Sequence, residues 1–163
     1  MPRLQVDIAE AVKLGAVDPL FYCKYFFPKT VRQDFPLYAR DQWAALEDPT
    51  KRYVCIQIFR DGAKTTTCRL VTSKRIAYGI SHNIVYTSNS EGHAARSVRW
   101  IRRQVDHNTL WAQAFGLRRG EKWTDTECEI IHGVDEFPIH VMAVGITGQV
   151  RGINMDDYRP DVS

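Results

Sequence analysis

The segment from Phe59 to Thr66 contains residue types that could bind the phosphates of a nucleotide. It reads Phe-Arg-Asp-Gly-Ala-Lys-Thr-Thr, follows the apolar run 53–58 and precedes a helix-like stretch. A tight turn that ends in Lys-Thr at a helix start can aim backbone N–H groups and one ammonium at phosphate oxygens, while a threonine hydroxyl ligates Mg²⁺. With Lys64 as the ammonium and Thr65 as the hydroxyl, the segment predicts ATP and Mg²⁺ as cofactors.

The same segment also allows a simpler interpretation. In the pattern G-x-x-x-x-G-K-[ST], Ile58 occupies the first glycine position and Ala63 the second, so Gly62 is the glycine that remains. A strand-to-helix turn at Asp61-Gly62, with Lys64 as a solvated first-turn residue, fits these letters equally well. On spacing alone both interpretations stay open.

Length and composition indicate one soluble globular domain spanning residues 1–163. The chain has 163 residues, of which 44% are hydrophobic and 25% are charged, values that are typical of a folded core and not of a disordered chain. The formal net charge of +3 is compatible with an acidic polymer as partner but does not demonstrate one. The four cysteines form no C-x-x-C pair, which favours reduced thiols in a cytosolic protein. No apolar stretch has the length of a membrane span, and the first residues lack the apolar block of a signal peptide, so we expect no export and no membrane partner.

The first fifty residues predict a helical lead-in. Apolar residues recur at helical spacing from Leu4 to Val12, and a second short helix is expected over 19–27. Pro36 could be the first residue of a third helix that ends near Pro49. The near-continuous apolar run 52–58 then predicts a central strand buried on both faces.

The sequence pattern of residues 51–163 predicts a strand–loop–helix core. The expected elements are a helix from Lys64 to about Tyr78 ended by Gly79, a strand over 83–87 that completes a strand–helix–strand unit, and a helix with an apolar stripe at Ala94, Val98, Ile101 and Val105. A hairpin of strands at 127–131 and 140–146 follows, and residues 148–161 read as a loop. The predicted fold class is α/β, a twisted and mostly parallel sheet of the P-loop NTPase type with flanking helices.

With these elements in place, the chain resembles the N-terminal ATPase domain of the large terminase subunit, the DNA-packaging motor of tailed bacteriophages. Residues 60–66 look like the family's P-R-[DG]-x-G-K-[ST]-T loop, and Gln42 precedes Lys64 by 22 residues, where the family has its adenine-recognising glutamine. The resemblance spans most of the chain and includes Tyr86-Thr87-Ser88-Asn89-Ser90 with Ala94-Ala95, Lys122-Trp123, Val150-Arg151-Gly152 and Arg159-Pro160-Asp161.

The resemblance implies that the chain is an ATP-binding part of a motor that drives double-stranded DNA into a capsid. It implies in-line attack of water on the γ-phosphate, a ring homo-oligomer, the small terminase subunit and the portal protein as partners, and the cytoplasm of the bacterial host as location. In the family, Arg-Pro-Asp runs directly into the Walker B strand, whereas this sequence ends at Ser163. The resemblance therefore implies a fold that is incomplete at the C-terminus, without Walker B and nuclease domain, and a chain that does not turn over ATP by itself.

The resemblance also assigns the site residues. Arg60, Lys64 and Arg151 would stabilise charge during phosphoryl transfer, Thr65 would ligate Mg²⁺, and the nucleotide would contact Gln42, Arg60, Asp61, Gly62, Ala63, Lys64, Thr65 and Thr66. Ala63 departs from the family, which usually has glycine before the lysine. Its Cβ would cost about 1–2 kcal/mol if the position requires a positive φ.

Several of these residues have alternative interpretations. Gln42 could be a solvated helix residue, Arg60 an exposed loop arginine, and Arg151 a partner of Asp156 or Asp157. Ser88 and Ser90 could sense a γ-phosphate, but a helix cap is favoured, and the arginines at 96–103 could contact DNA, but a solvated face is favoured. Asp135-Glu136 is not predicted to be a catalytic pair, because His132-Gly133 interrupts the apolar run before it and is typical of a hairpin turn, and the histidines show no metal-ligand spacing. The rival function is a non-catalytic prophage remnant, or a nucleic-acid-binding module with a P-loop-like turn.

Overall fold

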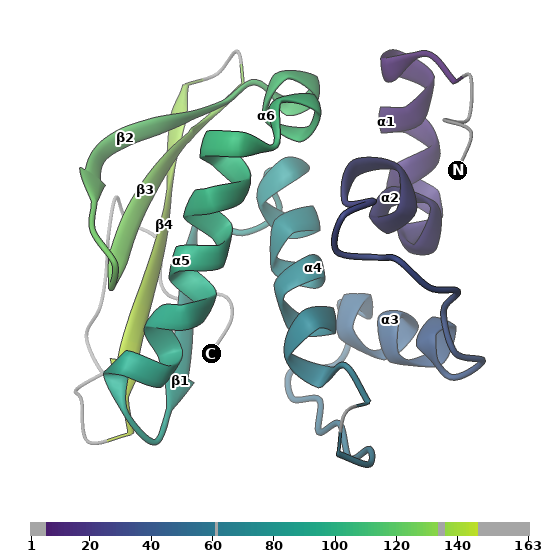
Figure 1. The fold of residues 1–163 in the computed structure, drawn as a ribbon, viewed down its shortest axis with the longest axis horizontal. Coiled ribbons are helices and arrows are strands. Elements are labelled where there is room, and N and C mark those ends of the chain that lie inside the picture. The colour runs from purple at the N-terminus through teal and green to yellow at the C-terminus, as the bar shows by residue number, and fades with distance from the viewer. Residues whose placement is uncertain (1–5, 61, 134–135, 147–163) are drawn as a thin grey trace. The chain divides into compact units, whose positions relative to one another are not determined.

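The chain divides into two compact units, residues 1–74 and residues 75–163. The structure, a computed structural model, describes residues 6–60, 62–133 and 136–146. In the described part of the chain the first unit holds helices and no strand, and every strand belongs to the second unit (Figure 1). The observed fold is α/β, as predicted.

The first unit confirms the predicted helices. Its elements are α1 (Ile8–Val17), α2 (Pro19–Phe26), α3 (Ala39–Glu47) and α4 (Lys64–Ala77), the last of which crosses into the second unit. Helix α3 begins one turn later than Pro36, whose carbonyl accepts a hydrogen bond from Ala39 N at 2.9 Å. The largest buried side chains of this unit are Tyr22, Phe26, Phe27 and Trp43.

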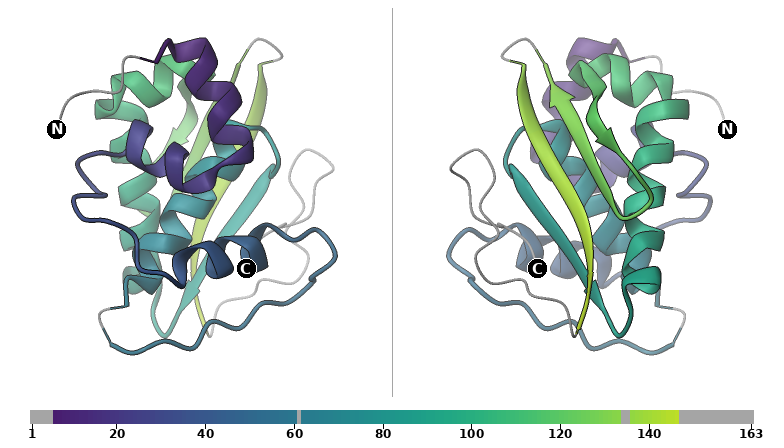
Figure 2. Two further views of the ribbon diagram at one scale, coloured as in Figure 1. Left: turned by 90° about the vertical axis from the view of Figure 1, so that its right-hand side faces the viewer. Right: turned by 90° about the vertical axis from the view of Figure 1, so that its left-hand side faces the viewer.

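Asp18 joins α1 directly to α2. Its backbone N–H donates to Leu14 O at 2.9 Å and ends α1, while its side chain accepts from Leu20 N at 3.0 Å and from Phe21 N at 3.3 Å. Pro19 occupies the first position of α2, where the missing N–H and the fixed φ are both tolerated. One residue thus ends one helix and begins the next, and the two helices pack against each other (Figure 2).

The predicted central strand at 52–58 is wrong. The segment is not a strand, and half-buried Val54, Ile56 and Ile58 alternate with exposed neighbours such as Tyr53, which is 88% exposed. An apolar run supplies side chains for a buried face, but a strand also needs a neighbouring strand for its backbone N–H and C=O groups, and the described residues of this unit contain none. The strand–helix–strand unit expected around α4 is therefore not formed.

The second unit is a four-stranded sheet in the order β1-β4-β3-β2 (Figure 2). Strand β1 (Asn83–Ser88) pairs in parallel with β4 (Phe137–Gly145), whereas β3 (Glu127–His132) pairs antiparallel with both β4 and β2 (Leu117–Trp123). The sheet is mixed, so the prediction of a mostly parallel sheet is wrong. The reason is that β2, β3 and β4 follow one another closely in the chain, and connections as short as these can join only antiparallel strands.

Helix α5 (Glu91–His107) lies along this sheet and contacts all four strands (Figure 1). The predicted stripe at Ala94, Val98, Ile101 and Val105 is buried, and Ser90 caps the helix by accepting a hydrogen bond from His93 N at 3.3 Å. The predicted cap role of Ser90 is confirmed. The core of this unit also includes Ile84, Trp111, Ile130, Ile139 and Val141.

Two elements of this unit were not predicted. Helix α6 (Thr109–Phe115) is short, begins at Asn108, whose side chain accepts from Trp111 N at 3.2 Å, and ends at Gly116 with φ +64°. Strand β2 is an edge strand in which only Leu117 is buried, so it lacks an alternating apolar pattern. The predicted hairpin is confirmed by the antiparallel pairing of β3 with β4, and Gly133, which follows β3, has φ +55°. Within the described residues, the helices are too short or too polar to cross a lipid bilayer.

Candidate nucleotide-binding site

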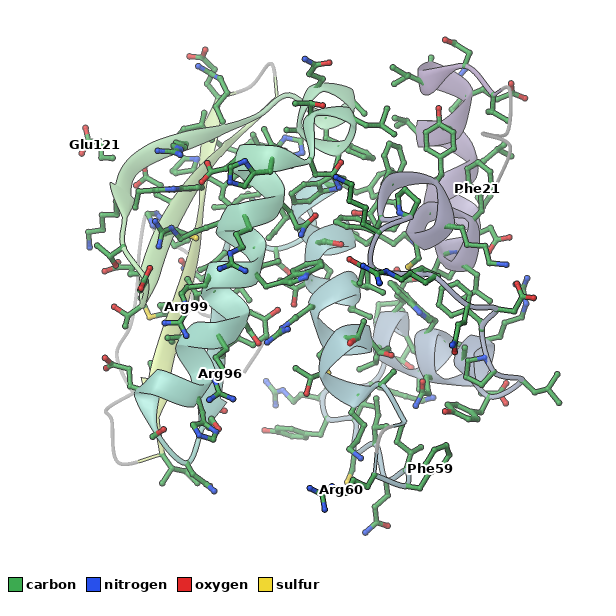
Figure 3. All side chains as sticks on the ribbon, viewed as in Figure 1. Phe21, Phe59, Arg60, Arg96, Arg99 and Glu121 are labelled. Atoms are coloured by element: carbon green, nitrogen blue, oxygen red, sulfur yellow. The ribbon has the colours of Figure 1, made fainter. Side chains whose placement is uncertain are left out.

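The loop before α4 forms a tight turn around Gly62. Gly62 N donates to Phe59 O at 3.2 Å, and Gly62 is buried. A Cβ atom on Gly62 would lie 2.6 Å from Ile58 Cδ1 and 3.1 Å from Phe59 O, so a larger residue would require the Ile58 side chain to move and the carbonyl of Phe59 to shift slightly. Phe59 and Arg60 project at the outer end of this loop (Figure 3).

Ala63 has a left-handed backbone conformation, which is the condition under which its Cβ was expected to be costly. Its φ is +56°, in the region where a Cβ meets the carbonyl oxygen and costs about 1–2 kcal/mol. Ala63 O accepts the first backbone bond of α4, from Thr67 N at 2.8 Å. The geometry of an α-helix leaves the N–H groups of Lys64, Thr65 and Thr66 without acceptors inside the helix, so this end of α4 favours an anion.

Lys64 is turned back onto its own loop. Its Nζ donates to Ile58 O at 2.9 Å and to Phe59 O at 3.1 Å, and the side chain is exposed. These contacts hold the ammonium beside the turn and satisfy two loop carbonyls. To contact a phosphate, the ammonium must exchange these carbonyls for phosphate oxygens.

A cavity of about 460 Å³ lies beside this loop within the first unit. Its walls come from the segment 30–36, from α3 and from the start of α4. It is lined by Thr30, Val31, Arg32, Gln33, Asp34, Phe35, Pro36, Tyr38, Ala39, Gln42, Trp43, Gly62, Ala63, Thr66, Thr67 and Leu70.

The cavity brings some of the predicted site residues together and leaves others out. Gln42 and Thr66 line it, with Gly62 and Ala63, although Gln42 is far from the loop in sequence. Arg60, Lys64 and Thr65 do not line the cavity and are exposed beside it. Asp61 and Arg151 lie outside the described residues.

Gln42 presents a donor without an acceptor. Its side-chain Nε2 is buried and has no hydrogen-bond partner. A buried donor that is left unpaired costs about 1–3 kcal/mol, so a ligand that supplies an acceptor is favoured there. The edge of adenine offers ring-nitrogen acceptors beside its amino donor, which matches the amide of a glutamine.

The aromatic side chains that line the cavity were not predicted as site residues from the sequence. Phe35, Tyr38 and Trp43 line it, and the Tyr38 ring meets the ring of Phe59 edge-on with 6.2 Å between centroids. The available signal was helical spacing for Tyr38, which precedes Gln42 by four residues, whereas the spacing of Trp43, directly after Gln42, gives no such signal. These rings supply the apolar surface that small-molecule sites use around a few polar groups.

Asp34, the acidic residue among the described residues that line the cavity, forms an ion pair with a neighbouring lysine. Lys24 Nζ donates to Asp34 Oδ1 at 2.9 Å, and this hydrogen bond holds the pKa of Asp34 below its usual range. Asp34 therefore stays a carboxylate at neutral pH and is paired with an ammonium. Arg32, which also lines the cavity, adds a positive charge.

Two of the arginines of α5 make ion pairs within the second unit, whereas Arg96 and Arg103 are exposed. Arg99 and Arg102 both pair with Asp125, and the guanidinium of Arg102 lies 5.5 Å from the centroid of the Trp123 ring. Arg96 and Arg99 project outward from the helix (Figure 3). In the described residues, no group of three or more His, Cys, Asp or Glu side chains could hold a metal ion.

Comparisons of the chain with protein-family models, with curated proteins and with solved structures found no match. The ligand of this site is therefore inferred from its own side chains and backbone.

Proposed function

We propose that this chain binds ATP with Mg²⁺ at the cavity bounded by the segment 30–36, α3 and the start of α4. The observation that carries the proposal is that one cavity is lined by Gln42, whose side-chain Nε2 is unpaired, together with Gly62, Ala63 and Thr66 of the loop. Its volume of about 460 Å³ falls in the range of roughly 300–1,000 Å³ that is typical of small-molecule sites.

The phosphate side of the proposed site is the N-terminal end of α4. Here the backbone N–H groups of the first turn, the positive end of the helix dipole and the Lys64 ammonium would face phosphate oxygens. The Thr65 hydroxyl is exposed at the same end and would be the protein ligand of Mg²⁺, with phosphate oxygens and water completing the octahedron. Mg²⁺ would neutralise charge on the phosphates, and the exposed Arg60 lies within the same loop.

The base side of the proposed site is α3 with the segment before it. Gln42 would pair with the edge of adenine, and Phe35 and Tyr38 would provide apolar surface for the ring. This arrangement favours a nucleotide over a simple phosphate ligand, because both ends of the molecule gain contacts.

The proposed biological role is the nucleotide-binding part of a P-loop ATPase that packages double-stranded phage DNA. The support is the resemblance of the segment 60–66 and of Gln42 to the terminase pattern, together with the lining of one cavity by Gln42 and by Gly62, Ala63 and Thr66 of that segment. Under this proposal the small terminase subunit, the portal protein and further copies of this chain in a ring are the partners, and the protein acts in the cytoplasm of the host.

A second candidate is a chain that binds nucleotide without turning it over. The observation that favours it is that Asp34, the described acid of the cavity lining, is already paired with Lys24. A carboxylate held by an ammonium is a poor general base, and water needs a positioned base to attack a γ-phosphate.

Titration calorimetry with ATP–Mg²⁺ tests the proposal. We expect weak binding by the wild type, no binding by Lys64→Ala, and unchanged binding by Lys29→Ala, which removes an exposed lysine outside the loop and outside the cavity lining. Equal affinity in the wild type and Lys64→Ala would contradict the proposed site, and ATP hydrolysis that Lys64→Ala removes would contradict the second candidate.

A further inference from the structure

An ion pair between largely buried side chains links α3 to α4 outside the cavity lining. Lys74 Nζ lies 2.8 Å from Glu47 Oε1, and the two side chains are 4% and 27% exposed. The same ammonium donates to Ala16 O at 3.3 Å and lies 6.0 Å from the centroid of the Trp43 ring. Burying a lysine is costly unless it is paired and hydrogen-bonded, so these contacts define one position for the ammonium.

The ion pair lies between α3 and α4, one helical turn beyond the residues of these helices that line the cavity. On α4, Lys74 lies one helical turn beyond Leu70, on the face that also carries Thr66 and Thr67. On α3, Glu47 lies one turn beyond Trp43. The cavity and the ion pair therefore occupy successive turns between the same two helices.

We infer that Glu47 and Lys74 are positioning residues that fix Gln42 on α3 against the phosphate-facing end of α4 and thereby set the preference for an adenine nucleotide. The inference rests on the proposed function, because it assigns the base to α3 and the phosphates to α4. Neither residue lines the cavity, so each acts through the helix that carries it.

An ion pair suits this task better than apolar contacts alone. Apolar packing is non-directional, so apolar side chains of two helices can shift against each other with little change in buried area. A charge-assisted hydrogen bond has a short optimal distance and a preferred angle. Gln42, five residues before Glu47 on the same short helix, is placed by that geometry.

The test compares two ligands on the full chain, ATP–Mg²⁺ and inorganic tripolyphosphate–Mg²⁺. We expect Glu47→Gln to weaken ATP binding about tenfold while tripolyphosphate binding changes less than about twofold, because only ATP needs α3 in place. A double variant, Glu47→Leu with Lys74→Met, replaces the pair by apolar side chains, stays folded and shows the same selective loss. Lys51→Gln removes the exposed pair with Asp48 just beyond α3 and serves as the matched control, with no change for either ligand.

A second readout does not depend on any ligand. Hydrogen exchange of the α3 amides should quicken in Glu47→Gln while the amides in the middle of α4 stay protected. An equal loss for both ligands, or unchanged ATP binding and unchanged α3 exchange, would overturn the inference. If the wild type binds neither ligand, the proposed function fails, and the exchange of α3 still decides whether the pair positions that helix.

Discussion

The ammonium of Lys64 lies 2.9 Å from the carbonyl oxygen of Ile58, the residue at the start of its own loop. A second bond to Phe59 O, at 3.1 Å, makes the contact bidentate. The loop thus satisfies its lysine internally, and phosphate binding is an exchange of carbonyl acceptors for phosphate acceptors.

Lys64→Ala is expected to abolish ATP–Mg²⁺ binding, because it removes the one loop ammonium at the start of α4. It should lower the free energy of unfolding by only about 1 kcal/mol, since the two bonds to the loop are exposed. Calorimetry measures the first effect and urea denaturation the second. A large loss of stability would mean that the missing affinity reports unfolding and not the site.

Ala63→Gly is expected to raise the free energy of unfolding by about 1 kcal/mol, because glycine adopts φ +56° without the strain of a Cβ. It should also tighten nucleotide binding by opening the approach to the phosphates. Ala44→Gly is the matched control, since Ala44 is exposed within α3 and the change there should destabilise by about 1 kcal/mol. Destabilisation by both variants would show that the loop tolerates the methyl group.

Gln42→Leu is expected to lower the affinity for ATP without lowering the free energy of unfolding. Replacing a buried amide whose Nε2 has no partner removes an unsatisfied donor, so the free energy of unfolding should stay the same or rise. ATP affinity should fall by about 1–2 kcal/mol while tripolyphosphate affinity is unchanged. Parallel loss of affinity for both ligands would place Gln42 on the phosphate side and contradict its assignment to the base.

Two buried thiols are expected to make stability fall at high pH. Burial raises the pKa of Cys128 to about 12 and raises that of Cys23 further, whereas an unfolded thiol titrates near pH 8.5. Below about pH 8 both states are protonated and the thiols contribute no pH dependence. Above it the unfolded state binds fewer protons than the folded state, so stability falls by up to about 1.4 kcal/mol per pH unit for each thiol.

Urea denaturation at pH 8 and pH 10 measures this loss. The fall in stability should be smaller in Cys128→Ala than in the wild type, and unchanged in Cys55→Ala, which replaces an exposed cysteine. Equal falls in all the proteins would show that other groups cause the pH dependence.

The 163-residue chain is expected to bind ATP without hydrolysing it. Among the described residues that line the cavity, the acid is Asp34, and it is paired with Lys24. A positioned catalytic base and an arginine finger each contribute about 10²–10⁵ to the rate of phosphoryl transfer. A steady-state phosphate-release assay should therefore show background rates in the wild type and in Lys64→Ala. Activity that Lys64→Ala removes would require an acid of this chain to complete the site.

Local periodicity predicted most helices because each carries its own signal. The stripe on α5 and the cap at Ser90 could be predicted without knowing any neighbouring element. The run 52–58 was misjudged because its apolar composition says nothing of a partner strand. Strand β2 was missed because an edge strand has little to bury, and the mixed sheet follows from pairings that sequence spacing does not reveal.

The composition of the loop could be predicted from the sequence, but the aromatic lining of the cavity and the geometry of the site could not. The loop sequence predicted Gly62, Lys64 and Thr65 as site residues, and only a resemblance placed Gln42 with them. Gly62 and Gln42 line the cavity, whereas Lys64 and Thr65 do not. That Ala63 has a positive φ and that Lys64 folds back onto Ile58 O are three-dimensional facts, because both depend on the path of the loop.

The dual role of Asp18 has a consequence for the order of folding. Because one residue ends α1 and begins α2, the contacts between these helices join residues that are close in sequence, and closing such a short loop costs little entropy. We expect this helical pair to form early, whereas the contact of Glu47 with Lys74 spans a longer stretch of chain and follows later. Asp18→Ala should then slow refolding, whereas Glu47→Gln should mainly hasten unfolding.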